Sequence, residues 1–146
     1  MSLIPMLALA SALAAPAPGA DDMGDGQKLV GTWVAKSVII SGNALQPMDV
    51  ATHRVVISRE EIIFKWGDKK EAPFRYKLNP AAKPKQIDLT VQLEPHKGRV
   101  SLGIYQLDGD KLTLCNNHRL TDKRPTEFKS MPLDGMSVYI LERVKK

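Results

Sequence analysis

Most of the chain alternates short apolar stretches with turn residues, at a spacing typical of β-strands. Phe74, Tyr76 and Leu78, for example, are separated by single basic residues. This period of two places one set of side chains on a buried face and the other in solvent. The stretches that we expect to be extended are 32–40, 53–58, 61–66, 71–78, 87–93, the two arms of 99–116, 126–128 and 137–143.

The clearest hairpin lies within residues 99–116. Its central turn pair is either Asp108-Gly109 or Gly109-Asp110, because such pairs readily adopt positive φ. The two registers differ by two residues and therefore leave the same side chains on one face. That shared apolar face is predicted to contain Tyr105, Leu107, Leu112 and Leu114.

Eight or nine strands of this kind, joined by short connections and without a long helix, indicate an all-β domain. An antiparallel up-and-down barrel of about eight strands explains the short connections better than a sandwich does. The segment 27–30 is expected to form one short helical turn before the first strand. A domain of this size can bury a sizeable core without disulfides.

The first 20 residues differ from the rest because they contain no charged side chain. Residues 3–15 are apolar but too few to span a bilayer, and Ala12-Leu13-Ala14 fits a small-x-small cleavage pattern. We expect 1–20 to be a signal peptide for export to the periplasm or exterior, 21–28 a linker, and 29–146 the barrel domain. An apolar tail is the alternative, because no Lys or Arg precedes the apolar run. No other stretch is long and apolar enough for a transmembrane segment.

The charge is positive but dispersed: 21 Lys and Arg against 16 Asp and Glu give a net charge of +5. Small basic clusters at turns favour solubility and protect sheet edges. The same surface could attract acidic polymers. Aromatic residues are few, which argues against a stacking platform for single-stranded nucleic acid, and no specific nucleic-acid partner is expected.

Five segments, in the same order along the chain, resemble segments of known proteins. Gly31-Thr32-Trp33 resembles the Gly-x-Trp signature of lipocalins, which implies that Trp33 plugs one end of the barrel and that Arg143 packs over it. The chain also resembles a family of conserved, exported bacterial domains, best known from planctomycetes and described as lipocalin-like. This resemblance covers 29–143 and implies a barrel and an exported setting, but no reaction. The segments that carry it are 29–33, 76–80, 84–89, 102–112 and 124–128.

The residues that often carry chemistry are sparse. The histidines are His53, His96 and His118, and Cys115 is the single cysteine, so no intramolecular disulfide can form. A structural zinc site needs four ligands in paired spacings, which these residues do not offer, so we expect no metal. The sequence also contains no phosphate-cradling glycine loop and no Gly-x-Ser-x-Gly elbow, so we expect no cofactor and no catalytic residue. Cys115 is expected to be a small buried hydrophobe rather than a nucleophile.

The function that these features favour is a non-enzymatic binding module for a small apolar or amphipathic ligand. The candidate lining residues are aromatic and lie on alternating strands: Trp66, Phe74, Tyr76, Tyr105 and Phe128. Phe128 is expected to cap the barrel mouth, with Glu127 paired to Arg124 or Lys129. An envelope protein that binds acidic polymers and an enzyme of unrecognised class are the alternatives. The sequence leaves open the ligand, the oligomeric state, and whether the barrel is hollow or packed.

Overall fold

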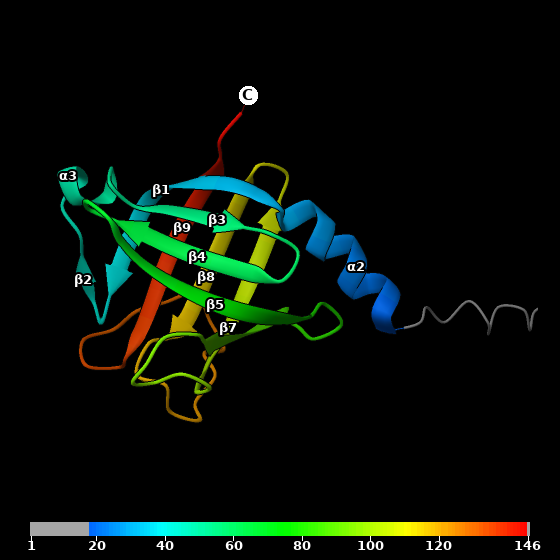
Figure 1. Ribbon diagram of the computed structural model, residues 1–146. Helices are drawn as coiled ribbons and strands as arrows, with labels where there is room; N and C mark the ends of the chain where they lie inside the picture. Colours follow the sequence, from blue (N-terminus) through cyan, green and yellow to red (C-terminus); the bar gives the residue numbers. More distant parts are fainter. Residues whose placement is uncertain (1–17, 146) are drawn as a thin grey trace, which may run out of the picture.

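The structure, a computed structural model, describes residues 18–145 and is dominated by one closed, antiparallel barrel of eight strands (Figure 1). Strands follow one another around the barrel in chain order, and the last pairs with the first. This confirms the predicted up-and-down architecture. The eight strands are β1 (Gly31–Ile40), β3 (Arg54–Ile57), β4 (Glu61–Trp66), β5 (Lys70–Asn79), β6 (Gln86–Val91), β7 (Val100–Asp108), β8 (Lys111–Asn117) and β9 (Met136–Arg143).

Three small elements lie at the two ends of the barrel. The helix α2 (Pro18–Leu29) leads into β1, while the strand β2 (Asn43–Ala44) and the helix α3 (Pro47–Val50) follow it. Figure 1 shows α2 on the side of the molecule opposite α3 and β2. We call the end near α2 the closed end, and the end where β1 finishes and β9 begins the open end.

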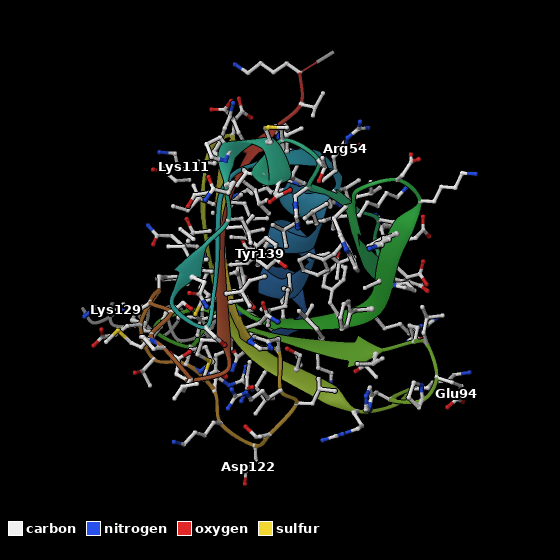
Figure 2. All side chains as sticks on the ribbon, turned by 90° about the vertical axis from the view of Figure 1, so that its left-hand side faces the viewer. Arg54, Glu94, Lys111, Asp122, Lys129 and Tyr139 are labelled. Carbon is white, nitrogen blue, oxygen red and sulfur yellow. The ribbon has the colours of Figure 1, made fainter. Side chains whose placement is uncertain are left out.

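The main core fills the barrel with the side chains that alternate inward along each strand. Tyr105 pairs with Leu114 and Leu107 with Leu112, so the turn pair is Gly109-Asp110 and the predicted apolar face is confirmed. Figure 2 shows Tyr139 within the packed interior, whereas the labelled charged residues lie at the periphery. The largest fully buried side chains of this core include Trp33, Tyr105, Ile62, Ile87, Leu89, Leu112, Leu114 and Leu141.

Trp33 occupies the closed end and is completely buried. Its indole Nε1 donates to the Leu29 carbonyl at 2.9 Å, and the Arg143 guanidinium lies 4.4 Å from the ring centroid. Arg143 also donates to the carbonyls of Lys28 and Val30. The expected pairing of Trp33 and Arg143 is therefore confirmed. A β-carbon on Gly31 would lie 3.0 Å from the Arg143 Nη1 atom, so glycine leaves room for the guanidinium.

A second, smaller core lies on the outer face of the barrel. Ile104, Cys115, Met136 and Val138 are buried there, and Phe128 packs against them. The prediction that Phe128 caps the barrel mouth is therefore wrong. The outward side chains of three adjacent strands are themselves apolar, and Phe128 covers them instead.

The loop 118–135 that carries Phe128 is fastened to the barrel wall. Arg124 donates to the Gly103 carbonyl at 2.9 Å and forms an ion pair with Asp88 at 2.7 Å. Glu127 pairs with Lys129 at 3.2 Å, as one of the two predicted alternatives. Residues 126–128 are not a strand, because side-chain contacts with the barrel wall hold the loop there instead of a ladder.

Two further expectations differ from the structure. The segment 21–28 is helical rather than a linker, because contacts from Asp25 and Leu29 to the barrel outweigh the low helix propensity of its glycines. The strand expected to reach residue 93 ends at Val91, where the chain turns and leaves Leu93 exposed. The proposed cleavage pattern at 12–14 lies outside the described residues.

Candidate functional site

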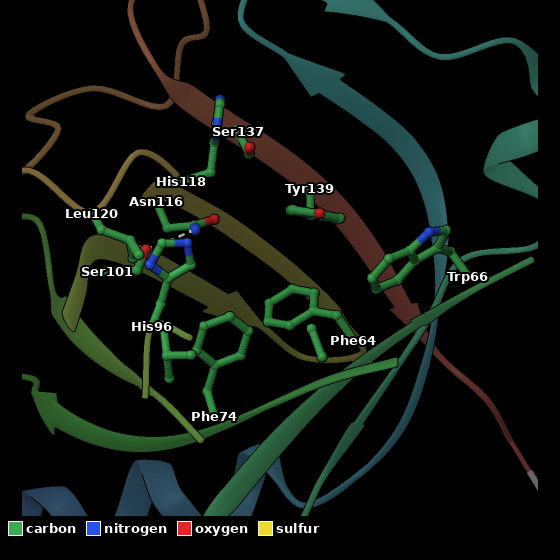
Figure 3. Close-up of a pocket in the computed structure, with 12 residues that line it drawn as sticks. Phe64, Trp66, Phe74, His96, Ser101, Asn116, His118, Leu120, Ser137 and Tyr139 are labelled. Atoms are coloured by element: carbon green, nitrogen blue, oxygen red, sulfur yellow. Dashed lines mark hydrogen bonds between the residues drawn. The ribbon is translucent and has the colours of Figure 1, made fainter. Parts of the chain in front are cut away.

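A pocket of about 290 Å³ lies inside the open end of the barrel (Figure 3). Its lining comes from strands on both sides of the barrel and from the two loops that follow β6 and β8. One wall is aromatic and the other is polar. The lining residues are Phe64, Trp66, Ala72, Phe74, Val91, His96, Ser101, Asn116, His118, Leu120, Ser137 and Tyr139.

The aromatic wall is built from rings that hold one another in place. Phe64 meets Phe74 edge to face at a centroid distance of 5.6 Å, and it meets Tyr139 at 5.2 Å. Trp66 stands closer to solvent and stacks on His53 at 6.4 Å. Aromatic side chains of this kind offer large apolar contact area with little rotamer freedom to lose. The wall can therefore accept a flat apolar body.

The polar wall consists of three small side chains at the open ends of β7, β8 and β9. Ser101, Asn116 and Ser137 point into the barrel and are buried, although their side chains are polar. Asn116 pairs with Gly103 on one side and with Ser137 on the other, which brings the three strands into register there. Buried polar groups are costly unless they are hydrogen-bonded, so a polar patch inside an apolar barrel indicates a specific role.

Hydrogen bonds satisfy most of this wall but leave one acceptor free. Ser101 Oγ donates to the Asn117 carbonyl at 2.8 Å and accepts from Asn116 Nδ2 at 2.9 Å. Among the described residues, Asn116 Oδ1 is the buried side-chain polar atom without a hydrogen-bond partner. In Figure 3 this oxygen points into the pocket, away from Ser101.

The mouth of the pocket carries the two loop histidines and Leu120. His118 Nε2 lies 3.1 Å from Ser41 Oγ. Burial, with a further contribution from the nearby Arg119 guanidinium, lowers the pKa of His118 despite the opposing effect of Asp134. The imidazole is therefore neutral at pH 7. Arg99 joins the two loops by donating to the Leu120 carbonyl at 3.2 Å.

The titratable side chains that line the pocket are His96, His118 and Tyr139. Burial raises the pKa of the Tyr139 hydroxyl to about 12, so it stays protonated at neutral pH. The lining contains no carboxylate, and no group of three metal-ligating side chains occurs within residues 18–145.

The five residues predicted to line a ligand site lie in three different parts of the molecule. Trp66 and Phe74 line the open-end pocket. Tyr76 packs against the main core and donates its hydroxyl to the Ser58 carbonyl at 2.7 Å, at the β3–β4 turn. Tyr105 is buried and bonds to Asp25 of α2, and Phe128 lies outside the barrel. The strands cross the whole length of the barrel, so inward aromatics near their far ends cannot reach the open end.

The polar wall was missed at the level of sequence, although a signal for it exists. Ser101 continues the inward series that includes Gly103 and Tyr105, and Asn116 continues that of Leu112 and Leu114. Polar residues at inward positions of a barrel strand break the expected pattern. Such a break in the alternation is the sequence signal that could have located the polar wall.

Asp25 attaches α2 to the barrel at the closed end. Its carboxylate accepts from the Tyr105 hydroxyl at 2.5 Å and from Lys85 Nζ at 2.9 Å. Burial by itself raises the pKa of Asp25, but the Tyr105 hydroxyl and the charges of Lys85 and Lys28 outweigh it, and the pKa lies below its ordinary value of 3.8.

This lowered pKa predicts how stability depends on pH. The stabilisation is present above about pH 4 and is lost as the pH falls through the folded-state pKa. We expect Asp25→Asn to lower the free energy of unfolding by about 1–2 kcal/mol at pH 7. The difference in free energy of unfolding between the unmodified protein and Asp25→Asn should shrink toward pH 2, which urea titrations at several pH values would measure. A difference that stays constant from pH 7 to pH 2 would contradict the lowered pKa of Asp25.

Cys115 lies in the outer core and not in the pocket. It is completely buried, its thiol donates to the Lys129 carbonyl at 3.6 Å, and burial raises its pKa to about 11. Since the thiolate is the reactive form, we expect iodoacetamide to leave the folded protein unmodified at pH 7.5. The same reagent should alkylate Cys115 after unfolding in urea, as mass spectrometry can detect. Equally fast alkylation of the folded protein would overturn this prediction.

Comparisons with known proteins add no family to this picture. The chain matches no protein-family model, no curated protein and no solved structure. Among the described residues, no helix is long and apolar enough to cross a membrane.

Proposed function

We propose that this protein is an exported, lipocalin-like binding protein that holds a small and largely apolar ligand in the open end of its barrel, without catalysing a reaction. The observation that carries the proposal is the pocket, with a wall of interlocked aromatic rings facing a wall of three buried polar side chains. Eight-stranded barrels have room for one small ligand when side chains do not fill them.

The size of the pocket limits the ligand. Its volume of about 290 Å³ lies just below the usual range for ligand sites, which is about 300–1,000 Å³. One or two fused rings fit this space, whereas a long lipid tail would need the part of the barrel that Trp33, Tyr105 and their neighbours fill. Small bicyclic aromatics are therefore suitable probes.

Indole binding tests the proposal. We expect indole to shift the backbone amide signals of Asn116 and Ser137 in a saturable way when it is titrated into the isotopically labelled protein. Ala72 lines the pocket, so Ala72→Leu should fill part of it and weaken indole binding at least about tenfold. The matched control is Ala81→Leu, because Ala81 is exposed in the turn after β5 and lies outside this lining. Indole binding that Ala72→Leu leaves unchanged would contradict the proposal.

The basic surface supports the alternative, an acidic polymer as partner, less well. Several exposed cations already face a carboxylate within 4 Å. These pairs are Lys36–Glu142, Lys65–Glu71, Arg75–Glu60 and Lys145–Asp110. A strong anion site would instead gather unpaired cations on one face.

A further inference from the structure

The open-end pocket presents a hydrogen-bond acceptor, and its chemistry restricts the ligand. Asn116 is 8% exposed, and its Nδ2 is engaged while its Oδ1 is not. An unpaired buried acceptor is unfavourable, so native proteins seldom keep one unless something else meets it.

The orientation of the Asn116 amide follows from the hydrogen bonds of Ser101. A serine hydroxyl has one hydrogen to donate, and Ser101 gives it to the Asn117 carbonyl, which can only accept. Ser101 Oγ must therefore accept from Asn116, and only the Nδ2 end of the amide can donate. Rotating the amide would place two acceptors against each other. The oxygen is thus the end that faces the pocket.

The surroundings of Asn116 Oδ1 favour a neutral donor over a cation. Among the residues that the structure describes, no carboxylate lines the pocket, and the histidines at the mouth add no negative charge. An ammonium group would have to leave water without an anion to replace its hydration, which is costly. A neutral N–H or O–H group needs one acceptor, which Asn116 supplies.

We propose that the ligand is a neutral, planar molecule with an N–H or O–H group, and that this group donates to Asn116 Oδ1 while the ring body lies against the Phe64, Phe74 and Tyr139 wall. This inference rests on the proposed function, because it specifies the occupant of the same pocket. Ser101 is a positioning residue in this arrangement, since it holds the amide without meeting the ligand's donor.

Three bicyclic probes of nearly equal shape test the inference. Indole has an N–H donor, benzofuran has a ring oxygen that can only accept, and indene has neither. We expect indole to bind the unmodified protein about tenfold more tightly than benzofuran or indene, because only indole satisfies the buried acceptor. Dissociation constants come from the amide shifts of pocket residues during titration.

Two variants identify the atom responsible. Asn116→Leu removes the acceptor at similar size, so the preference for indole should fall to less than about twofold. Ser101→Ala leaves Asn116 in place but frees its amide to rotate, so the preference of indole over benzofuran should also shrink. Ala81→Leu, outside the pocket, should keep the full preference. The amide spectrum of each variant shows first that it is folded, and the comparison of the three probes on the unmodified protein needs no variant.

The outcomes separate this inference from the function on which it rests. If the three probes bind equally, or if benzofuran binds best, the proposed role of Asn116 is wrong while the binding function stands. If none of the probes binds, the binding function itself is contradicted. A preference for indole that survives Asn116→Leu would assign the donor contact to another atom and would overturn the inference.

Discussion

Replacing Trp33 by alanine is expected to lower the free energy of unfolding by about 3–5 kcal/mol, the range for large aromatic residues removed from a core. Trp33 is completely buried at the closed end. Its loss would leave a cavity there, free the Leu29 carbonyl from its 2.9 Å hydrogen bond, and remove the ring beneath the Arg143 guanidinium. Urea unfolding followed by far-ultraviolet circular dichroism measures the effect without relying on tryptophan fluorescence.

The second tryptophan provides the matched control. Trp66 lies at the open end, is only partly buried, and stacks on His53 rather than filling the core. We expect Trp66→Ala to cost about 1 kcal/mol, because much of the ring already contacts water. Equal losses for the two variants would contradict the assignment of Trp33 as the plug of the barrel.

Gly103→Ala is expected to lower the free energy of unfolding by about 1–3 kcal/mol, the usual cost of forcing an extra group into packed space. A β-carbon at this position would lie 2.7 Å from the Cys115 carbonyl oxygen and 3.0 Å from the Asn116 β-carbon. Both neighbours belong to β8, so backbone must move to make room. The same displacement should weaken indole binding, because Asn116 moves with its strand.

Gly24→Ala is the control for this substitution. Gly24 lies within α2, and within the described part of the chain no heavy atom outside its own helix and neighbours lies within 4 Å of the added β-carbon. Alanine favours a helix interior over glycine by about 1 kcal/mol, so Gly24→Ala should raise stability slightly. Urea unfolding measures both variants. If Gly103→Ala were also stabilising, the close approach of β7 to β8 at the pocket wall would be contradicted.

The alternation of apolar and polar residues predicted the barrel well because a register shift of one residue would move all the inward apolar side chains of a strand into solvent. This constraint determined which side chains of the β7–β8 hairpin share a face, although the sequence did not decide between the two possible turn pairs. The plug at Trp33 was anticipated in another way, because the resemblance of Gly31-Thr32-Trp33 to the lipocalin signature implied it. The Arg143 guanidinium does lie over the Trp33 ring.

The pocket was less predictable because it depends on depth along the barrel rather than on which face a side chain takes. Tyr76 and Tyr105 alternate inward as Phe74 does, yet their hydroxyls bond near the closed end. Phe128 is aromatic but covers a second apolar surface outside the barrel, which only the tertiary arrangement creates. The linker prediction failed for a similar reason, since Asp25 finds its partners 60 and 80 residues away.

A crystal structure of the protein grown with indole tests the central claim most directly. The predicted result is one indole in the open-end pocket, with its ring against Phe64 and Phe74 and its nitrogen within hydrogen-bond distance of Asn116 Oδ1. The contradictory result is a pocket closed by movement of Phe74 and Trp66, with indole absent or bound elsewhere on the molecule.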